Sequence, residues 1–262
     1  MEQGWERKAL EARLGDLAAA AERGELAVSA FLTPKEGLVA TRYFKTHGIS
    51  YRMFGGYADA ERVRAYVLPS YMEGVDESDL SSLLESFGYE SRISCLRVKG
   101  SGYASLSHRD FLGSLLGLGL ERSIIGDLLV TDGTALVFCD TPIVSFLLEE
   151  WRKVGNDAVR ISLVEDPSTD IPPRQFATIH DTIASPRLDA VVSALCRLSR
   201  DRAKTAVETG LVELDFEREE RPDRIVGASS IISVRGYGRY RILSVSEQTK
   251  KGRFRLDAQK YL

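Results

Sequence analysis

Three prolines within seven residues constrain this chain more than any other local feature. They lie at positions 167, 172 and 173, in the polar stretch Glu165-Asp-Pro-Ser-Thr-Asp-Ile-Pro-Pro173. Proline has no backbone N–H and fixes its own φ, so neither a helix nor a central strand runs through such a stretch. We therefore expect a linker over 166–182 and a separate C-terminal module over 183–262.

Formal charge is divided unevenly about this linker. Of the 35 Lys and Arg and the 38 Asp and Glu residues, 16 and 11 lie between residues 183 and 262, so this part carries +5. The other 182 residues carry −8. A basic module on an acidic body is typical of a protein with a polyanionic partner. A surplus of charge is also what any solvated face carries, so the asymmetry alone does not decide the function.

Apolar periodicity and capping residues predict an α+β fold with two segments before the linker. Residues 1–75 are expected to form a small α/β domain, with helices at 5–23 and 33–46 and strands at 49–54 and 62–69. Residues 76–165 are expected to open with a helix capped by Asp76. The order β-α-β-β-α-β follows, with strands at 92–99, 125–131, 134–139 and 158–164 and helices that start at Ser107 and Thr141. This is the order of ferredoxin-like and RRM-like domains.

The triplet His108-Arg-Asp110 also begins the catalytic loop of protein kinases. A kinase has Asn five residues after this Asp and a DFG motif further along the chain. Position 115 is leucine here, and no DFG follows. Ser107 and Asp110 instead have the spacing of a capping box in front of an apolar run. We predict that they begin a helix, which ends at the glycines 117 and 119.

Motifs for catalysis, metals and cofactors are missing from the sequence. The three histidines share no local helix or strand face, and the three cysteines are far apart with no CxxC pair. Walker A, GxGxxG and GxSxG loops do not occur. We therefore expect no cofactor, no metal and no small-molecule substrate. The sequence also has no secretory signal and no apolar run of about 18 residues, so we expect a cytoplasmic protein without a membrane partner.

Two short helices and three strands are predicted in the C-terminal module. The first helix would be capped by Ser185, and the second, capped by Ser199, would run from Arg200 to Glu208. Arg200 and Lys204 share one stripe of the second helix, where two cations oppose the helix dipole and a bound phosphate would reverse the penalty. A glycine-rich turn then carries two arginines and a tyrosine at 235–239. Arginines that contact phosphate beside a tyrosine that stacks on a base would make this turn an RNA-binding element. The alternative is an ordinary hairpin whose arginines are only solvated.

Several motifs resemble known proteins. Within the C-terminal module, Arg187-Leu-Asp189, Ser199-Arg200, Ala203-Lys204, Gly210-Leu-Val212 and Ile232-Ser-Val-Arg-Gly236 resemble the S4 RNA-binding domain. The whole chain resembles the bacterial YlmH family of S4-domain proteins. The matching stretches are Leu32-Thr-Pro-Lys-Glu36, Gly55-Gly-Tyr57, Ala60-Glu-Arg62, Leu106-Ser-His-Arg-Asp-Phe-Leu-Gly113, Ile125-Gly-Asp127 and Val234-Arg-Gly-Tyr-Gly-Arg239.

This resemblance implies an N-terminal domain, an RRM-like middle domain and a C-terminal S4 domain that ends in a strand. It also implies association with the large ribosomal subunit and with tRNA in quality control of stalled complexes; an older label of the family is cell division. The candidate RNA contacts are Arg187, Arg197, Ser199, Arg200, Arg202, Lys204, Arg235 and Arg239. The chain departs from the family at Asp215, where Asn is usual, and at Ser229, where Asp is usual.

Three hypotheses about function follow. The first is a non-enzymatic, monomeric RNA-binding protein that binds rRNA or tRNA on the ribosome. The second is an RNA-modifying enzyme with an accessory S4 domain, of the pseudouridine synthase or rRNA methyltransferase type, for which residues 1–165 lack a catalytic motif. The third is a scaffold of the cell-division machinery whose RNA binding is incidental.

Overall fold

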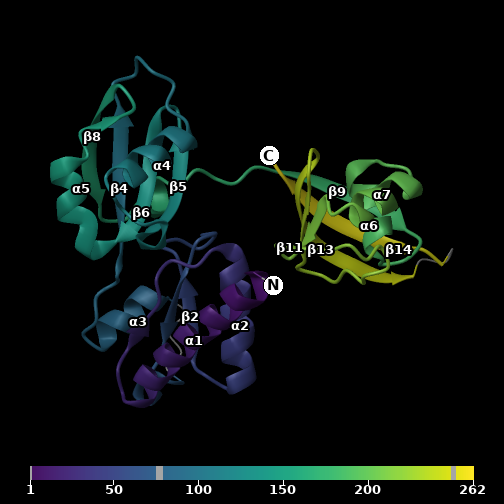
Figure 1. Ribbon diagram of the computed structural model, residues 1–262, viewed down its shortest axis with the longest axis horizontal. Helices are drawn as coiled ribbons and strands as arrows, with labels where there is room; N and C mark the ends of the chain where they lie inside the picture. Colours follow the sequence, from purple (N-terminus) through teal and green to yellow (C-terminus); the bar gives the residue numbers. More distant parts are fainter. Residues whose placement is uncertain (1, 75–78, 249–251) are drawn as a thin grey trace. The chain divides into compact units, whose positions relative to one another are not determined.

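The computed structural model describes residues 2–74, 79–248 and 252–262 (Figure 1). The chain forms two compact units, Met1–Pro172 and Pro173–Leu262, so the boundary falls within the proline-rich stretch. Both units combine helices with antiparallel strands, which confirms the predicted α+β class. The finer division of the first unit near residue 75 stays a prediction.

A three-stranded antiparallel sheet with helices on both faces makes up the N-terminal segment (Figure 1). Its elements are α1 (Glu2–Glu22), β1 (Ala27–Val28), α2 (Pro34–His47), β2 (Tyr51–Phe54), β3 (Arg64–Val67) and the 3-10 turn η1 (Ser70–Met72). The strand order is β1-β3-β2. Helix α2 begins as predicted, because Thr33 and Glu36 form a reciprocal capping box, and it ends at Gly48 with φ 65°.

A five-stranded antiparallel sheet forms the middle segment, in the order β5-β6-β4-β8-β7. Helix α3 (Leu80–Ser86) comes first but packs on the three-stranded sheet, beside Tyr66 and Met72. The elements that follow are β4 (Ile93–Gly100), α4 (His108–Gly117), η2 (Arg122–Ile124), β5 (Ile125–Thr131), β6 (Thr134–Asp140), η3 (Thr141–Ile143), α5 (Val144–Glu150), β7 (Lys153–Val154), β8 (Asp157–Val164) and η4 (Pro167–Thr169). Helices α4 and α5 cover one face of the sheet, where Phe111 and Leu147 are fully buried against Leu96 and Val98. The predicted order β-α-β-β-α-β is present, with the short edge strand β7 in addition.

Local details of this segment both confirm and correct the predictions. Asp110 accepts hydrogen bonds from the backbone N–H of Ser107 at 2.8 Å and from its hydroxyl at 2.6 Å, which confirms that they begin α4. The predicted cap Asp76 lies outside the described residues, and Asp79 is the N-cap of α3. Thr141 was expected to cap α5 but lies in η3, because its hydroxyl donates to the carbonyl of Ser91 and α5 begins only at Val144.

One buried arginine and one buried aspartate join the N-terminal and middle segments. The guanidinium of Arg62 donates to the backbone carbonyls of Phe31, Arg122 and Ile125 at 2.9 to 3.2 Å. In return, Asp127 accepts from the backbone N–H of Arg62 at 3.0 Å. Desolvation lowers the pKa of Arg62, and the three carbonyls offset that cost. Buried hydrogen bonds therefore connect the two segments within the first unit.

A second buried ion pair strengthens the same junction. Nη1 of Arg64 lies 2.5 Å from Oδ1 of Asp140, and Nε of Arg64 donates to the carbonyl of Ser29 at 2.6 Å. The side chains of this pair are 5% and 12% exposed. Breaking such a pair on one side leaves an uncompensated buried charge and costs about 3–5 kcal/mol. The junction is thus held by polar contacts that tolerate little change.

The C-terminal unit is a six-stranded antiparallel sheet closed by two helices. Its elements are β9 (Phe176–Ile183), α6 (Leu188–Cys196), α7 (Arg200–Glu208), β10 (Val212–Leu214), β11 (Glu217–Arg218), β12 (Ile231–Val234), β13 (Gly238–Gln248) and β14 (Phe254–Tyr261). The strand order is β11-β10-β12-β13-β14-β9. The predicted apolar faces of both helices are buried in one core with β12, β13 and β14.

Strand β9 corrects the prediction of a linker over 166–182. Residues 176–183 pair in register with the whole of β14, from Tyr261 opposite Phe176 to Phe254 opposite Ile183. The strand lies at the edge of its sheet, and many of its residues are exposed polar ones, so it lacks the apolar alternation of a buried strand. That composition, directly after two prolines, concealed the strand in the sequence.

Candidate nucleic-acid interface

Two arginines that the sequence predicted as RNA contacts converge on a buried carboxylate. Nη2 of Arg200 lies 2.9 Å from Oδ2 of Asp189, and Nε of Arg187 lies 3.3 Å from Oδ1. The Asp189 side chain is 6% exposed, whereas the Arg187 and Arg200 side chains are 43% and 44% exposed. One side of each guanidinium is therefore fixed by the carboxylate, and the remainder faces solvent, where it can meet an anion.

Backbone hydrogen bonds to a neighbouring loop set the position of this carboxylate. The N–H groups of Leu188 and Asp189, at the start of α6, donate to the carbonyls of Arg224 at 2.8 Å and Pro222 at 3.0 Å. These two carbonyls accept from N–H groups that have no partner within the helix, so no side-chain cap is needed. The prediction that Ser185 caps this helix is therefore wrong, because α6 begins three residues later.

The remaining predicted residues of the two helices surround the first two turns of α7. Ser199 caps this helix as predicted, accepting from the backbone N–H of Arg202 at 3.3 Å. Arg197 ends α6 in the left-handed conformation, φ 53°, which makes the corner between the helices. Nζ of Lys204 lies 3.7 Å from Glu208, an exposed pair that contributes little to stability. We call this set the helix cluster: Arg187, Arg197, Ser199, Arg200, Arg202 and Lys204.

The predicted turn at 235–239 lies apart from the helix cluster. The N–H of Arg235 donates to the carbonyl of Leu211 at 2.9 Å, just beyond the end of α7. Helix α7 has nine residues and is about 13 Å long, so Arg200 lies at its other end. Arg239 is half-buried, with its guanidinium 5.5 Å from the ring of Phe216 and 5.9 Å from that of Tyr261. The predicted contacts thus form two groups on one unit.

The two departures from the family pattern occupy strained turn positions. Asp215 and Phe216, at φ 52° and 64°, form the two-residue turn between β10 and β11. The carboxylate of Asp215 accepts from the N–H of Ile231 at 2.8 Å. Ser229 has φ 67°. Asp and Asn both tolerate the left-handed conformation, so Asp215 is explained by its turn.

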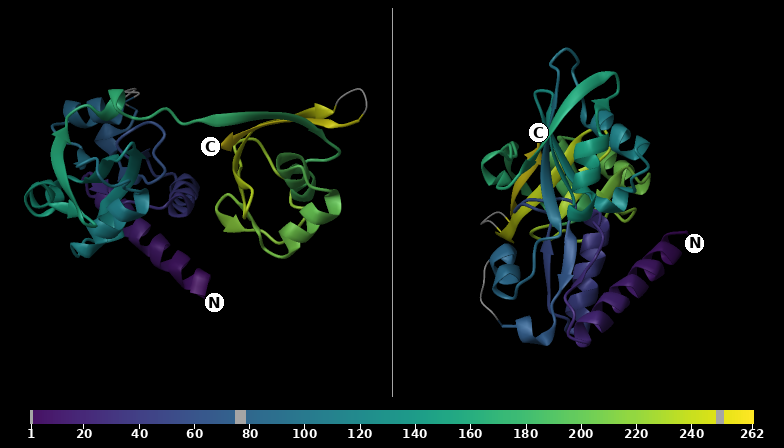
Figure 2. Two further views of the ribbon diagram at one scale, coloured as in Figure 1. Left: turned by 90° about the horizontal axis from the view of Figure 1, so that it is seen from above. Right: turned by 90° about the vertical axis from the view of Figure 1, so that its left-hand side faces the viewer.

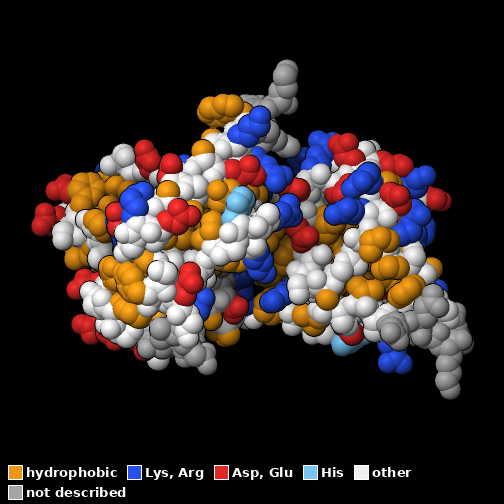
Figure 3. Space-filling model, turned by 90° about the horizontal axis from the view of Figure 1, so that it is seen from below, with side chains coloured by type: hydrophobic (Ala, Val, Ile, Leu, Met, Phe, Trp, Pro, Cys, Tyr) orange, Lys and Arg blue, Asp and Glu red, His pale blue; other side chains and the backbone are white. Residues whose placement is uncertain are grey.

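Charge on the C-terminal unit is mixed but rich in cations. Figure 3 shows Lys and Arg side chains gathered over this unit, with Asp and Glu among them. Part of this charge is paired on the surface, as in Arg218 with Glu220 and Arg221 with Glu219. Asp189 is the residue of the candidate site that the sequence motifs did not single out as one of its contacts. Its signal was available in Arg187-Leu-Asp189, but an acidic residue in the first turn of a helix is explained equally well by the helix dipole.

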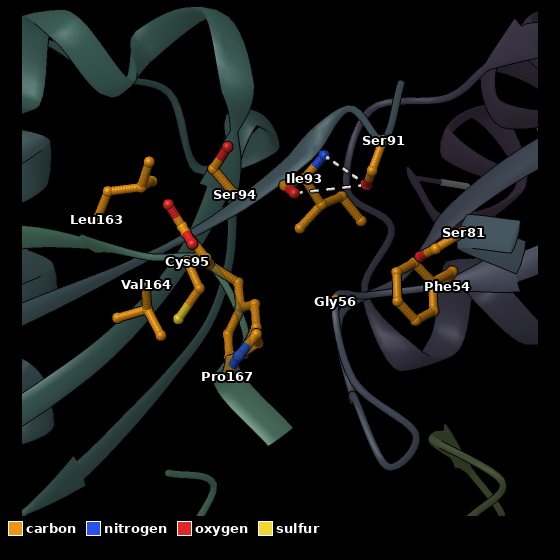
Figure 4. Close-up of a pocket in the computed structure, with 12 residues that line it drawn as sticks. Phe54, Gly56, Ser81, Ser91, Ile93, Ser94, Cys95, Leu163, Val164 and Pro167 are labelled. Carbon is orange, nitrogen blue, oxygen red and sulfur yellow. Dashed lines mark hydrogen bonds between the residues drawn. The ribbon is translucent and has the colours of Figure 1, made fainter. Parts of the chain in front are cut away.

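The first unit contains a pocket of about 260 Å³ near its two sheets (Figure 4). Phe54, Gly56, Ser91, Cys95 and Glu165 are among its lining residues. Desolvation raises the pKa of Cys95 to about 12, so its thiol stays protonated at neutral pH and is a poor nucleophile. Across the described ranges, no three His, Cys, Asp or Glu side chains are grouped to hold a metal ion, and no helix is long and apolar enough to cross a membrane.

These features define a class: an α+β protein whose C-terminal unit presents arginines held by a buried acid. Comparison with known proteins gives a more specific result. Residues 90–168 match a family model described as "Putative RNA-binding domain in YlmH". The "Ribosome-associated protein quality control protein P2" of Bacillus subtilis strain 168 is 28% identical over 235 residues, which are 90% of this chain and 87% of that protein.

A solved structure adds to these matches. The "Cell division protein ylmH from Streptococcus pneumoniae" superposes with a TM-score of 0.53 at 18% identity, over 64% of this chain and 95% of that one, and shows a shared fold. Together the three comparisons confirm the similarity to the YlmH family that the motifs indicated.

Proposed function

We propose that this chain is a non-enzymatic RNA-binding protein that acts on the ribosome in the quality control of stalled nascent chains. The observation that carries the proposal is the arrangement of Asp189, which holds Arg187 and Arg200 in fixed positions with half of each side chain still open. Fixed guanidinium groups lose little entropy when they bind phosphate, so they suit RNA backbone recognition.

The architecture supports S4-type and RRM-like domains within the two units. The helix pair α6–α7 carries the S4-like motifs and packs on the C-terminal sheet. In the middle segment, the order β5-β6-β4-β8 places the first and third strands of the β-α-β-β-α-β pattern at the centre, as in the split βαβ fold. Residues 90–168, which match the RNA-binding family model, include this whole pattern.

The ribosomal part of the proposal is supported by the relative from Bacillus subtilis, whose name places it in ribosome-associated quality control. We propose rRNA of the large subunit and tRNA as the RNA partners, a monomeric state and a cytoplasmic location with the ribosomes. The name of the Streptococcus pneumoniae structure refers to cell division, and the experiment below distinguishes that role from ribosome binding.

Co-sedimentation with ribosomes tests this proposal. We expect that Arg200→Ala with Lys204→Ala weakens binding about tenfold or more, since two charge-assisted phosphate contacts are lost. Lys204→Ala alone tests the same surface without touching Asp189. The matched control is Lys8→Ala with Arg42→Ala, two exposed cations of α1 and α2.

The outcomes of these experiments distinguish the three hypotheses about function. Unchanged co-sedimentation of the Arg200 and Lys204 variant, with an unchanged melting curve, would sink the proposal. Nucleotide modification of rRNA by the purified wild-type protein would favour the enzyme hypothesis instead. A division defect in cells whose ribosome binding is normal would favour the scaffold.

A further inference from the structure

The centre of the open face of the middle sheet is covered by the protein's own chain. The ring of Tyr57 lies 5.0 Å from that of Phe138 in β6, at an interplanar angle of 30°. The Tyr57 hydroxyl donates to Asp127 at 2.8 Å. Gly56, at φ 99°, passes so close that a Cβ atom there would lie 2.4 Å from the Phe138 ring. Tyr57 thus occupies the place above Phe138 where a base could stack, and an RNA contact on this segment has to lie elsewhere.

One end of the same face stays open and carries two opposed cations. Lys99 in β4 pairs directly with Arg160 in β8, so their side chains leave the same face of the sheet. Both are exposed, and neither forms an ion pair with any residue in the described ranges. Like charges directly opposite each other destabilise a sheet. A phosphate between them would turn this repulsion into attraction.

A fully exposed aromatic side chain follows Lys99 by four residues. Tyr103 is 98% exposed, in the loop that rises beyond the end of β4 (Figure 1, Figure 2). The base of this loop is fixed, because the buried carboxylate of Asp157 accepts from the backbone N–H of Ser101 at 3.0 Å and also from its hydroxyl. The Tyr103 ring packs against no other part of the protein, so both of its faces are open to a ligand.

We propose that Lys99, Arg160 and Tyr103 form a second RNA contact, which takes a single-stranded segment. A phosphate binds between the two cations, and an unpaired base stacks on Tyr103. Four extended residues span at most about 14 Å, so neighbouring nucleotides of one strand reach both parts. This contact assigns residues and a single-stranded ligand to the segment that matches the RNA-binding family model, and it does not depend on the helix cluster.

Charge favours RNA over a protein partner. The adjoining turn between β5 and β6 contributes the exposed Asp132. Asp157 shares one face of β8 with Val159 and Ile161, which pack against the helix-covered core, so its charge belongs to the other face of the sheet. The face around Lys99 and Arg160 therefore keeps a positive surplus, which suits a polyanion. An exposed tyrosine beside paired cations is the combination that single-strand binding proteins use for base and backbone.

Fluorescence anisotropy of the full chain with a fluorescein-labelled ten-residue oligouridylate tests the proposal. We expect Tyr103→Ala to weaken binding about fivefold to 150-fold, the effect of one stacked base, and Tyr103→Phe to leave it unchanged. Lys99→Glu with Arg160→Glu should also reduce the slope of log affinity against log salt by about 0.7, for the one phosphate contact on a single strand. Lys8→Glu with Arg42→Glu is the control of equal charge.

The outcomes separate this proposal from the function proposed above. If Tyr103→Ala binds the oligouridylate as the wild type does, the stacking contact is refuted. If the Lys99 and Arg160 variant behaves like its charge control, the phosphate contact is refuted, whatever the helix-cluster variants do. If these variants lose binding to whole ribosomes but keep binding to protein-free rRNA, the surface takes a ribosomal protein and the proposal fails.

Discussion

Replacement of Asp189 by Asn removes the negative charge that pairs with two arginines of the helix cluster and keeps the shape of the side chain. The Asp189 carboxylate makes one close ion pair, at 2.9 Å, and a longer one at 3.3 Å. Hydrogen bonds to a charged group contribute about 1.5–3 kcal/mol each, but both arginines are more than two-fifths exposed and regain water. We therefore expect Asp189→Asn to lower the free energy of unfolding of the C-terminal unit by about 2 kcal/mol.

Hydrogen exchange measures this change where it occurs. Amides of α6 and α7 in the variant should exchange about 30-fold faster than in the wild type, at a pH and temperature where opened amides reclose faster than they exchange. Both tryptophans, Trp5 and Trp151, lie in the first unit, so tryptophan fluorescence during denaturation should not change. Asp201→Asn, an exposed carboxylate in the first turn of α7, is the matched control and should cost about 0.5 kcal/mol.

RNA binding by the same variant separates two physical explanations. Asp189→Asn raises the net charge by one, so a purely electrostatic account expects tighter binding of RNA. If Asp189 acts by holding Arg187 and Arg200, binding should weaken despite the added positive charge. Tighter binding, or exchange rates equal to those of Asp201→Asn, would refute the argument that this carboxylate positions the arginines.

Two further perturbations probe the first unit. Tyr57→Phe should cost about 1–3 kcal/mol in tryptophan-monitored denaturation, because Asp127 stays buried and loses the hydroxyl donor; a loss below about 0.5 kcal/mol would show that water replaces it. Hydrogen bonds from Ser107 hold the pKa of Asp110 below its ordinary value, so the charged form is favoured by folding. The melting temperature of Asp110→Asn should therefore lie below that of the wild type at neutral pH. The difference should begin to shrink as the pH falls below the ordinary pKa of aspartate, and it should be lost below the lowered pKa of the folded state; a difference that does not shrink with falling pH would contradict this linkage.

Local signals in the sequence predicted three of the helix starts of this fold. The capping pairs at Thr33 and Ser107 and the cap at Ser199 depend on residues three apart, so spacing alone shows them. The start of α6 was missed because its N–H groups are satisfied by carbonyls more than thirty residues away, at Pro222 and Arg224. Strand β9 was missed because its partners in β14 are still more remote, 71 to 85 residues along the chain.

In the candidate site too, the sequence predicted individual residues but not the long-range contacts between them. Sequence motifs selected the exposed cations of the helix cluster, but no pattern shows that Arg187 and Arg200 share one buried carboxylate. Likewise, the motif Gly55-Gly-Tyr57 was recognised only as a family stretch. Its contact with Phe138 joins positions 81 residues apart, and the glycines matter because the chain passes close to that ring.

The junction of the first unit has a consequence for the order in which the chain is synthesised. Arg64 finds its partner 76 residues later, at Asp140, and the N–H of Arg62 finds its acceptor 65 residues later, at Asp127. A growing chain that has reached only residue 100 contains both arginines and neither carboxylate. Until β5 and β6 have left the ribosome, the Arg64 guanidinium lacks its carboxylate and the Arg62 guanidinium lacks the carbonyls of Arg122 and Ile125. We therefore expect the first unit to complete its folding in one late step.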